Sequence, residues 1–549
     1  MIMQHTALPG KHYFRTSLST PSAAVFSCKN HPPYSRQVAV GVEFLINTNN
    51  LGSAAMIIHT IQRKNRRLAP LLCCGLMLQL LTACAVVGPE YQKPDLHPAA
   101  QWNSPLLKGL QAEQADPQQM AAWWELLEDE QLSSLIERAV QGNLDLRTAA
   151  ERVEQARLQR DIQTTGRLPS VDAGGAASWR RNGNDGSSES YSSSLDAGWE
   201  ADLFGSVQRS IEAADADWQA SQEERRDVLV SLVAEVALNY IEVRSTQVQL
   251  ANVRKSLAMQ RETRQLVQWQ YEAGLDDDLA IHQAQYNLES SEAQIPALET
   301  SLAEAMNRLA VLLGQSPGSL HTELKEARAI PAIPATVAIG VPAEVIRRRP
   351  DIRKAENQLI AQTARIGVAT AELYPKLRLS GVIGINGSSV ARFAENIFSP
   401  AFWVQQAGLS ASWNIFDAGA IRKNIQVRSS QQKEALIAYE AAVLRAMEEV
   451  ENTLIAYVNE QGRRDSLERA VKEAEQATEL AEKKYKAGLI DFSTVLETQR
   501  TLLSFDKQLT GSEATMAANL IRLYKALGGG WPCCPEDTAN ATSSEEIDQ

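Results

Sequence analysis

Hydrophobic residues along this chain follow two periods, and the period changes at matching points in two long segments. Apolar and polar side chains alternate within residues 171–200, 377–386 and 407–415. Alternation with a period of two predicts β-strands that have one apolar and one polar face. The segments around these strands follow helical patterns, which predict helices at about 132–166, 205–271, 279–313, 344–372, 419–485 and 491–527.

Two of the predicted helices are unusually long. No Pro or Gly lies between Gly205 and Tyr271, and only Gly462 interrupts the segment from Gly419 to Tyr485. At 1.5 Å per residue, each segment predicts a helix of roughly 100 Å. Apolar residues also recur every seven positions, which predicts coiled-coil packing. The two rows are Leu229, Val236, Val243, Leu250, Leu257 and Tyr271, and Val443, Val450, Tyr457, Val471 and Tyr485.

The chain also contains an internal duplication. The triplet that starts at Asp145 recurs at Asp351, and Trp199 and Gly205 recur at Trp413 and Gly419. Each copy therefore predicts a helix, a strand hairpin, a long helix and a return helix. We place the copies at residues 132–314 and 344–527.

The predicted strands suit a membrane. They have about the 9–11 residues that a transmembrane strand needs, and Trp179, Trp199 and Trp413 lie near their ends as expected at a membrane interface. Alternation alone leaves open an ordinary antiparallel sheet with one wet face. In lipid, however, four strands cannot close a barrel and open edges are not tolerated, so several chains would have to share one. Two chains would give a narrow barrel of eight strands, and three would give twelve.

The N-terminal region resembles an export signal. A basic cluster at Arg63–Arg67 precedes the nearly uncharged residues 68–83, which end at Cys84 in the order Leu-Thr-Ala-Cys. This pattern resembles a bacterial lipobox, and a plain signal peptide is the alternative. The resemblance implies that residues 56–83 are removed, that Cys84 is lipidated and that the protein reaches the outer membrane. We predict that Met56 is the true start and that residues 1–55 are a misassigned extension.

Composition argues against enzymatic or nucleic-acid chemistry. The chain of 549 residues has a formal net charge of −12, whereas nucleic-acid readers carry basic patches. Its seven His form no H-E-x-x-H pair and its six Cys form no C-x-x-C, so no metal site is expected. A Walker A loop and a G-x-S-x-G turn are also absent from the sequence. We expect no enzyme and no cofactor other than the lipid on Cys84. The state of Cys533 and Cys534 stays open.

Seven short motifs, in order, carry a family resemblance. They start at Cys84 (Cys-Ala-Val-Val-Gly-Pro-Glu-Tyr), Trp123 (Trp-Trp), Asn143 (Asn-Leu-Asp-Leu-Arg), Trp199 (Trp-Glu-Ala-Asp-Leu-Phe-Gly), Arg348 (Arg-Arg-Pro-Asp-Ile-Arg), Trp413 (Trp-Asn-Ile-Phe-Asp-Ala-Gly) and Leu527 (Leu-Gly-Gly-Gly-Trp). Together they resemble the TolC-like outer membrane factors, and more narrowly the NodT-type efflux lipoproteins.

The resemblance implies an α+β membrane protein that forms a homotrimer. In it a twelve-stranded outer-membrane β-barrel would continue into a periplasmic α-helical barrel. An equatorial region would be built from residues 84–131, 315–343 and 528–549. The trimer would be the exit duct of an inner-membrane pump, joined to it by a periplasmic adaptor. An exit duct for secreted peptides or proteins, and a coiled-coil lipoprotein without a pore, remain alternatives. The sequence names neither the cargo nor the partners.

The resemblance also points to residues at the periplasmic tip. It implies that the helix turns contact the adaptor and that nearby acidic residues form a gate, where threefold repetition would favour cations. Alternatively, the glycines only end helices and the acidic residues only solvate a loop. The turn residues are Gly274, Leu275, Gly488 and Leu489, and the acidic residues are Asp276, Asp277, Asp278, Asp491 and Glu497.

Overall fold

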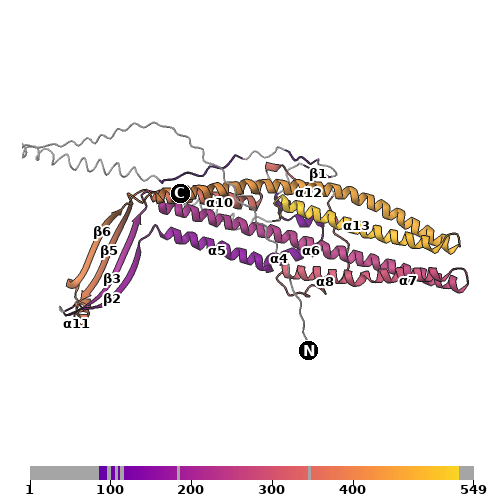
Figure 1. Ribbon diagram of the computed structural model, residues 1–549, viewed down its shortest axis with the longest axis horizontal. Helices are drawn as coiled ribbons and strands as arrows, with labels where there is room; N and C mark the ends of the chain where they lie inside the picture. Colours follow the sequence, from indigo (N-terminus) through magenta and orange to yellow (C-terminus); the bar gives the residue numbers. More distant parts are fainter. Residues whose placement is uncertain are drawn as a thin grey trace, which may run out of the picture. The chain divides into compact units, whose positions relative to one another are not determined.

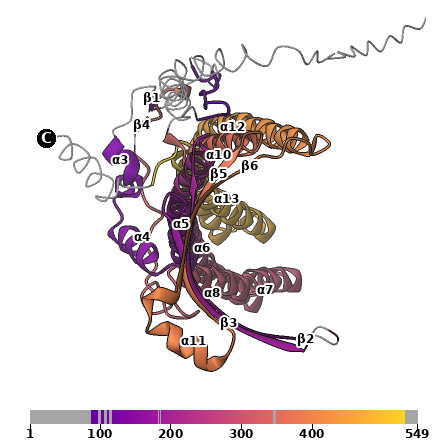
Figure 2. The ribbon, with the colours of Figure 1, turned by 90° about the vertical axis from the view of Figure 1, so that its left-hand side faces the viewer.

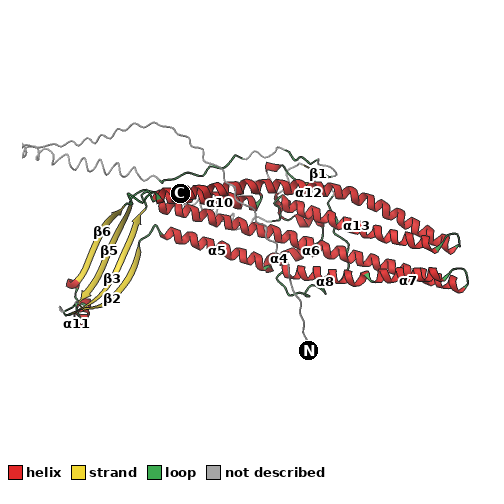
Figure 3. Cartoon of the chain, in the orientation of Figure 1, coloured by secondary structure: helices red, strands yellow, loops and turns green. Residues whose placement is uncertain are grey.

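The computed structural model describes residues 86–95, 101–104, 109–111, 117–181, 183, 186–334, 336–343 and 348–530. Residues 1–55, the predicted signal peptide, Cys84, Cys533 and Cys534 lie outside this part of the chain. The described elements include two copies of one design, in which a β-hairpin precedes a long antiparallel helical hairpin (Figures 1 and 3).

The first copy contains α4 (Glu130–Gly142), α5 (Leu144–Thr165), β2 (Ser170–Arg181), β3 (Ser187–Ala201), α6 (Ser206–Glu272), α7 (Asp278–Glu292) and α8 (Gln294–Leu312). The second contains α10 (Pro350–Ala371), β5 (Lys376–Gly387), α11 (Val390–Ile397), η2 (Pro400–Phe402), β6 (Trp403–Ser412), α12 (Ala420–Lys486) and α13 (Phe492–Ala526). The segments beside them form β1 (Leu110–Gln111), α3 (Pro117–Ala121), η1 (Trp123–Leu127) and β4 (Val337–Ala338).

The two hairpins join into one antiparallel sheet of order β2-β3-β5-β6. The register places apolar residues opposite one another, for example Leu195 with Ile383 and Leu379 with Leu409. Asp172 and Asp196 pair on the other face. The predicted separation into an apolar and a polar face is therefore confirmed. Strands β2 and β6 form the two edges of the sheet in this chain.

Helices α6 and α12 confirm the two long helices, since each has 67 residues. Most of the heptad row is buried, including Val236 and Val243 in α6 and Val450 and Tyr457 in α12. Tyr271 is an exception because 41 % of it is exposed, so its assignment to the packed row was wrong. No described helix is both long and apolar enough to span a membrane.

Several features differ from the sequence-based prediction. The helix expected at 132–166 is interrupted at Asn143, whose side chain caps α5 through the Leu146 N–H and donates to the Leu312 carbonyl, at 2.9 Å each. The return helix expected at 279–313 is divided into α7 and α8 at Ala293. The loop after β5 contains the unpredicted helix α11. Strand β6 ends at Ser412, so Trp413 follows the strand.

Segments from three parts of the sequence pack beside the helices. Strands β1 and β4 pair in parallel, the Trp123 ring stacks on Tyr524 at 5.4 Å, and the Gly530 N–H donates to the Met120 carbonyl at 2.9 Å. These contacts bring together parts of 84–131, 315–343 and 528–530. Trp123 belongs to a large core cluster that also contains Tyr240 from α6.

A fully buried arginine connects α6 to this region. Arg244 donates to the Gln247 side chain at 2.7 Å, the Glu326 carbonyl at 3.0 Å and the Gln131 side chain. Its Nη2 also donates to the Tyr240 hydroxyl at 3.0 Å. A buried guanidinium is costly unless most of its donors are bonded. Both Nη atoms of Arg244 have acceptors, whereas Nε has none among the described residues. The four bonds therefore fix α6 against α4 and Glu326.

Candidate functional site

The two helix turns farthest from the sheet have the same backbone (Figure 1). Gly274 and Gly488 follow α6 and α12 with φ angles of 70° and 69°. The Leu275 N–H donates to the Gln270 carbonyl at 2.8 Å, and the Leu489 N–H donates to the Lys484 carbonyl at 2.9 Å. This is the left-handed glycine end of a helix, in which orphan carbonyls regain partners. Both glycines therefore end helices.

The apolar residues of these turns point away from the protein. Leu275 is 79 % exposed and Leu489 is 72 % exposed. Both lie beside a small buried cluster that joins the two helical hairpins and includes Val267, Ala284 and Phe492. Exposed leucines beside a packed apolar cluster can provide a contact surface for a partner. An adaptor contact at these turns stays a prediction.

One hydrogen bond joins the two turns. The Tyr485 hydroxyl donates to Asp276 Oδ2 at 2.6 Å, and Tyr485 is only 5 % exposed. Burial, reinforced by this bond, raises the pKa of the Tyr485 phenol above its ordinary value near 10. The phenol therefore stays protonated and can donate at neutral pH. This bond was not expected from the sequence, in which Tyr485 was placed only in the heptad row. The signal was available, since a buried tyrosine needs a hydrogen-bond partner.

The predicted acidic residues occupy different environments. Asp276 is half-buried, whereas Asp277 caps α7 by accepting from the Ala280 N–H at 3.1 Å. Asp278 and Asp491 are exposed at the starts of α7 and α13. Glu497 is exposed further along α13. The structure therefore brings Asp276 to the second turn and leaves Glu497 open to solvent. Their role in a gate stays a prediction.

Further polar contacts behind the turns were also not anticipated. Gln499 donates to Thr263 and to Glu482 at 3.0 Å each. Arg500 donates to the Asn287 side chain at 2.9 Å, and its guanidinium lies 5.2 Å from the centre of the Tyr286 ring. These contacts connect α13 to α6, α7 and α12. The tip is therefore held by directional polar bonds as well as by apolar packing.

At the opposite end of the helices, residues 86–95 lie along α6 and α10. The Val87 N–H donates to the Phe204 carbonyl at 3.2 Å, and Glu90 pairs with the buried Arg209. Tyr91 donates to Glu356 at 3.1 Å. This segment begins two residues after Cys84, so the predicted lipid would be tethered near the junction of sheet and helices.

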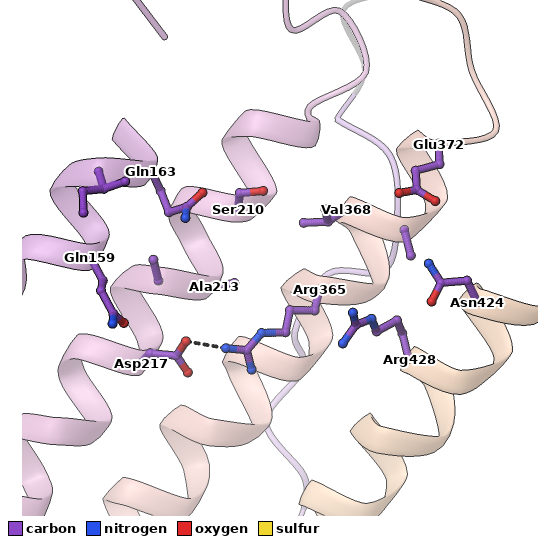
Figure 4. Close-up of a pocket in the computed structure, with 13 residues that line it drawn as sticks. Gln159, Gln163, Ser210, Ala213, Asp217, Arg365, Val368, Glu372, Asn424 and Arg428 are labelled. Carbon is purple, nitrogen blue, oxygen red and sulfur yellow. Dashed lines mark hydrogen bonds and ion pairs between the residues drawn. The ribbon is translucent and has the colours of Figure 1, made fainter. Parts of the chain in front are cut away.

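A polar cavity lies among the helices, on the side of α10 away from residues 86–95 (Figure 4). Its volume is about 410 Å³, and α5, α6, α10 and α12 line it. Asp217 and Arg365 pair across it, and Arg428 reaches toward Arg365 from α12. Burial raises the pKa of Asp217, which Arg365 opposes. At 100° per residue, Arg365 lies on the side of α10 opposite Glu356, and hence opposite residues 86–95.

The predicted interface aromatics lie at both ends of the sheet. Trp199 donates to the Arg167 carbonyl at 3.0 Å and Trp413 to the Leu373 carbonyl at 2.9 Å, at the end next to the helices. Trp179 is 63 % exposed near the far end of β2. Aromatic residues in two bands are typical of transmembrane strands, and their lipid contact stays a prediction. No described group of His, Cys, Asp and Glu is arranged to hold a metal ion.

This duplicated arrangement of β-hairpins and long helical hairpins is the architecture of an efflux channel of the outer membrane. The chain matches the family described as "Outer membrane efflux protein" over residues 135–315 and 341–529, and it belongs to that family. It is accordingly a protein of the outer membrane and not an enzyme. Channels of this family are homotrimers that work with adaptor proteins and inner-membrane pumps.

Named relatives and solved structures support the assignment. "Nodulation protein T" of Rhizobium leguminosarum bv. trifolii is 30 % identical over 457 residues, which is 82 % of this chain and 96 % of the relative. "Pyoverdine export outer membrane protein OpmQ" of Pseudomonas putida is 33 % identical over 477 residues, covering 83 % and 97 %. The outer-membrane channel OprN superimposes with a TM-score of 0.74 at 34 % identity, covering 81 % of this chain and 99 % of that one.

Proposed function

We propose that this protein is the exit duct of a tripartite efflux system. Three copies would share a twelve-stranded barrel in the outer membrane and an α-helical barrel in the periplasm. Small molecules delivered by an inner-membrane pump, through a periplasmic adaptor, would leave passively by this duct. Cys84 would carry the lipid that anchors each chain.

The observation that carries the proposal is the four-stranded sheet. It has an apolar and a polar face, and β2 and β6 are free edges in one chain. Unpaired strand edges are not tolerated in hydrocarbon, so a membrane would force β2 of one chain to pair with β6 of another. The polar face would then line a wet lumen, as in other large barrels.

The cavity beside Asp217 supports a lumen that continues below the membrane. Residues 86–95 lead to the proposed lipid, so their side of α10 must face outward. Arg365, on the opposite side of α10, would then face the duct together with Arg428. A wall that carries both signs of charge suits a passage for varied solutes. The names of relatives, which include "Cation efflux system protein CusC" and "Pyoverdine export outer membrane protein OpmQ", indicate different cargoes on one architecture.

The first test is the protein mass of the species extracted from outer membranes in mild detergent, by native mass spectrometry. Three copies are expected, and a monomer that survives gentle extraction would overturn the proposal. The same spectra should show Cys84 at the N-terminus, with lipid attached. Any peptide from residues 1–55 recovered from cells would contradict the predicted start at Met56.

The second test addresses the proposed gate at the tip. Replacing Glu497 with Ala should raise single-channel conductance or weaken block by multivalent cations, because three carboxylates would leave the mouth. The matched control is Glu434→Ala, which removes an exposed carboxylate from the half of α12 nearer the sheet. Planar-bilayer recordings in which both variants match the parent would remove Glu497 from the gate.

A further inference from the structure

Helix α11, in the loop between β5 and β6, is the feature that the proposed function does not use. Ser389 caps it by accepting from the Arg392 N–H at 3.3 Å. Val390, Phe393 and Ile397 are spaced along one side of the helix, whereas Arg392 and Glu395 project from the other side. The helix is therefore amphipathic although it has only eight residues.

Contacts fix the face of the sheet on which α11 lies. The Phe393 ring lies 6.4 Å from the Tyr191 ring, and a methyl group added to Gly387 would come within 2.6 Å of Phe393 Cα. The Asn396 side chain also donates to the Asn386 carbonyl at 2.6 Å. Tyr191 and Gly387 are paired residues of β3 and β5. Helix α11 therefore packs beside one specific face, at the end of the sheet away from the long helices.

That face is the apolar one. From Tyr191, every second residue of β3 lies on the same side, which includes Leu195 and Trp199. Their partners Ile383 and Leu379 on β5 are about half exposed in the single chain. In a membrane barrel this is the face that meets lipid. Figure 2 shows α11 on the convex side of the curved sheet, which is the outer side of a barrel wall.

Part of the apolar side of α11 is left uncovered by the sheet. Val390 is 62 % exposed and Ile397 is 43 % exposed, and Phe398, directly after the helix, is 86 % exposed. These side chains continue the lipid-facing surface beyond the last residues of β5. An exposed apolar surface of this kind, bordered by charged residues, marks a contact with another apolar phase.

We propose that α11 is an interfacial helix that embeds Val390, Ile397 and Phe398 in the outer leaflet of the membrane. Arg392 and Glu395 would lie at the level of the headgroups. This inference rests on the proposed function, because the sheet must span the outer membrane with the long helices in the periplasm. If α11 lies in the outer leaflet, the loop 388–402 contacts lipid beside the barrel and does not cover the pore.

The experiment places a fluorescent label on the helix in lipid vesicles. Val390→Cys and Phe398→Cys are made in the mature protein that starts at Cys84 and carries Cys533→Ser and Cys534→Ser. Each variant is labelled with an environment-sensitive dye and inserted in phosphatidylcholine vesicles. The parent without an added cysteine supplies the blank. Phosphatidylcholine with a nitroxide near the headgroup should quench these labels about twofold more than a label at Glu395→Cys on the polar side.

Each alternative location has its own signature. Quenching by aqueous iodide in place of nitroxide lipid would mean that α11 faces water or the pore mouth. Protection from both quenchers would mean that another chain covers the helix. Either result would overturn the proposal. Planar-bilayer conductance of the same labelled protein separates this failure from failure of the proposed function, which would abolish conductance as well.

A pair of glycine variants tests the docking geometry. Gly387→Ala should push Phe393 off the sheet and reduce nitroxide quenching at Val390→Cys, with conductance unchanged. Gly381→Ala is the matched control, because a methyl group there would lie on the same strand and face but 4.0 Å from its nearest neighbour, the Gln406 carbonyl. Equal quenching in the two variants would show that the contact with Gly387 does not position α11.

Discussion

The two helix turns at the tip share a backbone but differ in their side-chain contacts. Gly274 and Gly488 have nearly the same φ angle, and each is followed by an exposed leucine. Yet Tyr485 is buried and bonded to Asp276, whereas its counterpart Tyr271 is 41 % exposed. The copies therefore meet asymmetrically: the first supplies the carboxylate and the second supplies the phenol. Within one chain, the Tyr271 side of the first copy stays open.

Corresponding positions at the middle of the two long helices also differ in their contacts. Tyr240 and Arg244 of α6 correspond to Leu454 and Val458 of α12 in the duplication. In α6, Arg244 donates to the Tyr240 hydroxyl and to the Glu326 carbonyl of the equatorial region. In α12, both corresponding residues are apolar. Duplication thus conserved the helix and its seam, while a few substitutions assigned different partners to each copy.

The largest expected change in stability comes from removing the difference between α6 and α12 at the middle of the two helices. Arg244→Met should lower the free energy of unfolding by about 3 kcal/mol, because several buried acceptors lose their donor. The matched change Val458→Met, at the corresponding position of α12, should cost less than about 1.5 kcal/mol, because Val458 is only partly buried and the longer side chain has room at the surface. Thermal unfolding in detergent, followed by circular dichroism, measures both. Similar losses would mean that Arg244 contributes volume and not hydrogen bonds.

The bond between the turns should have the next largest effect. Tyr485→Phe removes the donor to Asp276 and should cost about 1.5 kcal/mol, since a hydrogen bond to a carboxylate is lost at a buried position. Tyr271→Phe should change stability by less than about 0.5 kcal/mol at its exposed position. Unfolding midpoints of the two variants make the comparison, and a larger shift for Tyr271→Phe would contradict it.

The backbone of the turns should respond equally in the two copies. Gly274→Ala and Gly488→Ala should each cost about 1 kcal/mol, because an alanine is strained at positive φ. Within the described part of the chain, no neighbouring atom lies within 4 Å of a methyl group added at either glycine, so crowding adds nothing. A clear difference between the two unfolding midpoints would show that one turn contacts something the other does not.

The smallest expected effect is the dependence of the Tyr485 contribution to stability on pH, which is absent in the neutral range. Because the pKa of Tyr485 is raised above its unfolded value near 10, its contribution is fully present below pH 10 and is lost as pH rises through the folded pKa. The difference in unfolding midpoint between parent and Tyr485→Phe should stay constant from pH 6 to about 9 and shrink at higher pH. A difference that changes below pH 8 would point to another titrating group.

Most of the architecture was accessible to sequence analysis. The period of two specified the faces of the strands, and the seven-residue rows specified the packed sides of α6 and α12. Both rules depend on spacing within one segment, so folding does not alter them. The break at Asn143 was missed because a side-chain cap can interrupt an apolar helical pattern. The break at Ala293 had a signal in Pro296, which lies in the first turn of α8 and cannot donate a helical hydrogen bond to a residue of α7.

The sequence by itself determined the duplication, the long helices, the glycine turns and the two faces of each strand. Only the tertiary structure decided that β3 pairs with β5, that Tyr485 meets Asp276, that Arg244 binds the equatorial segments and that α11 packs on the apolar face of the sheet. The heptad rule treats Tyr271 and Tyr485 alike, because it describes one helix at a time. Which of them finds a carboxylate depends on where a turn about 200 residues away is placed, and that placement is set by the packing of the whole chain.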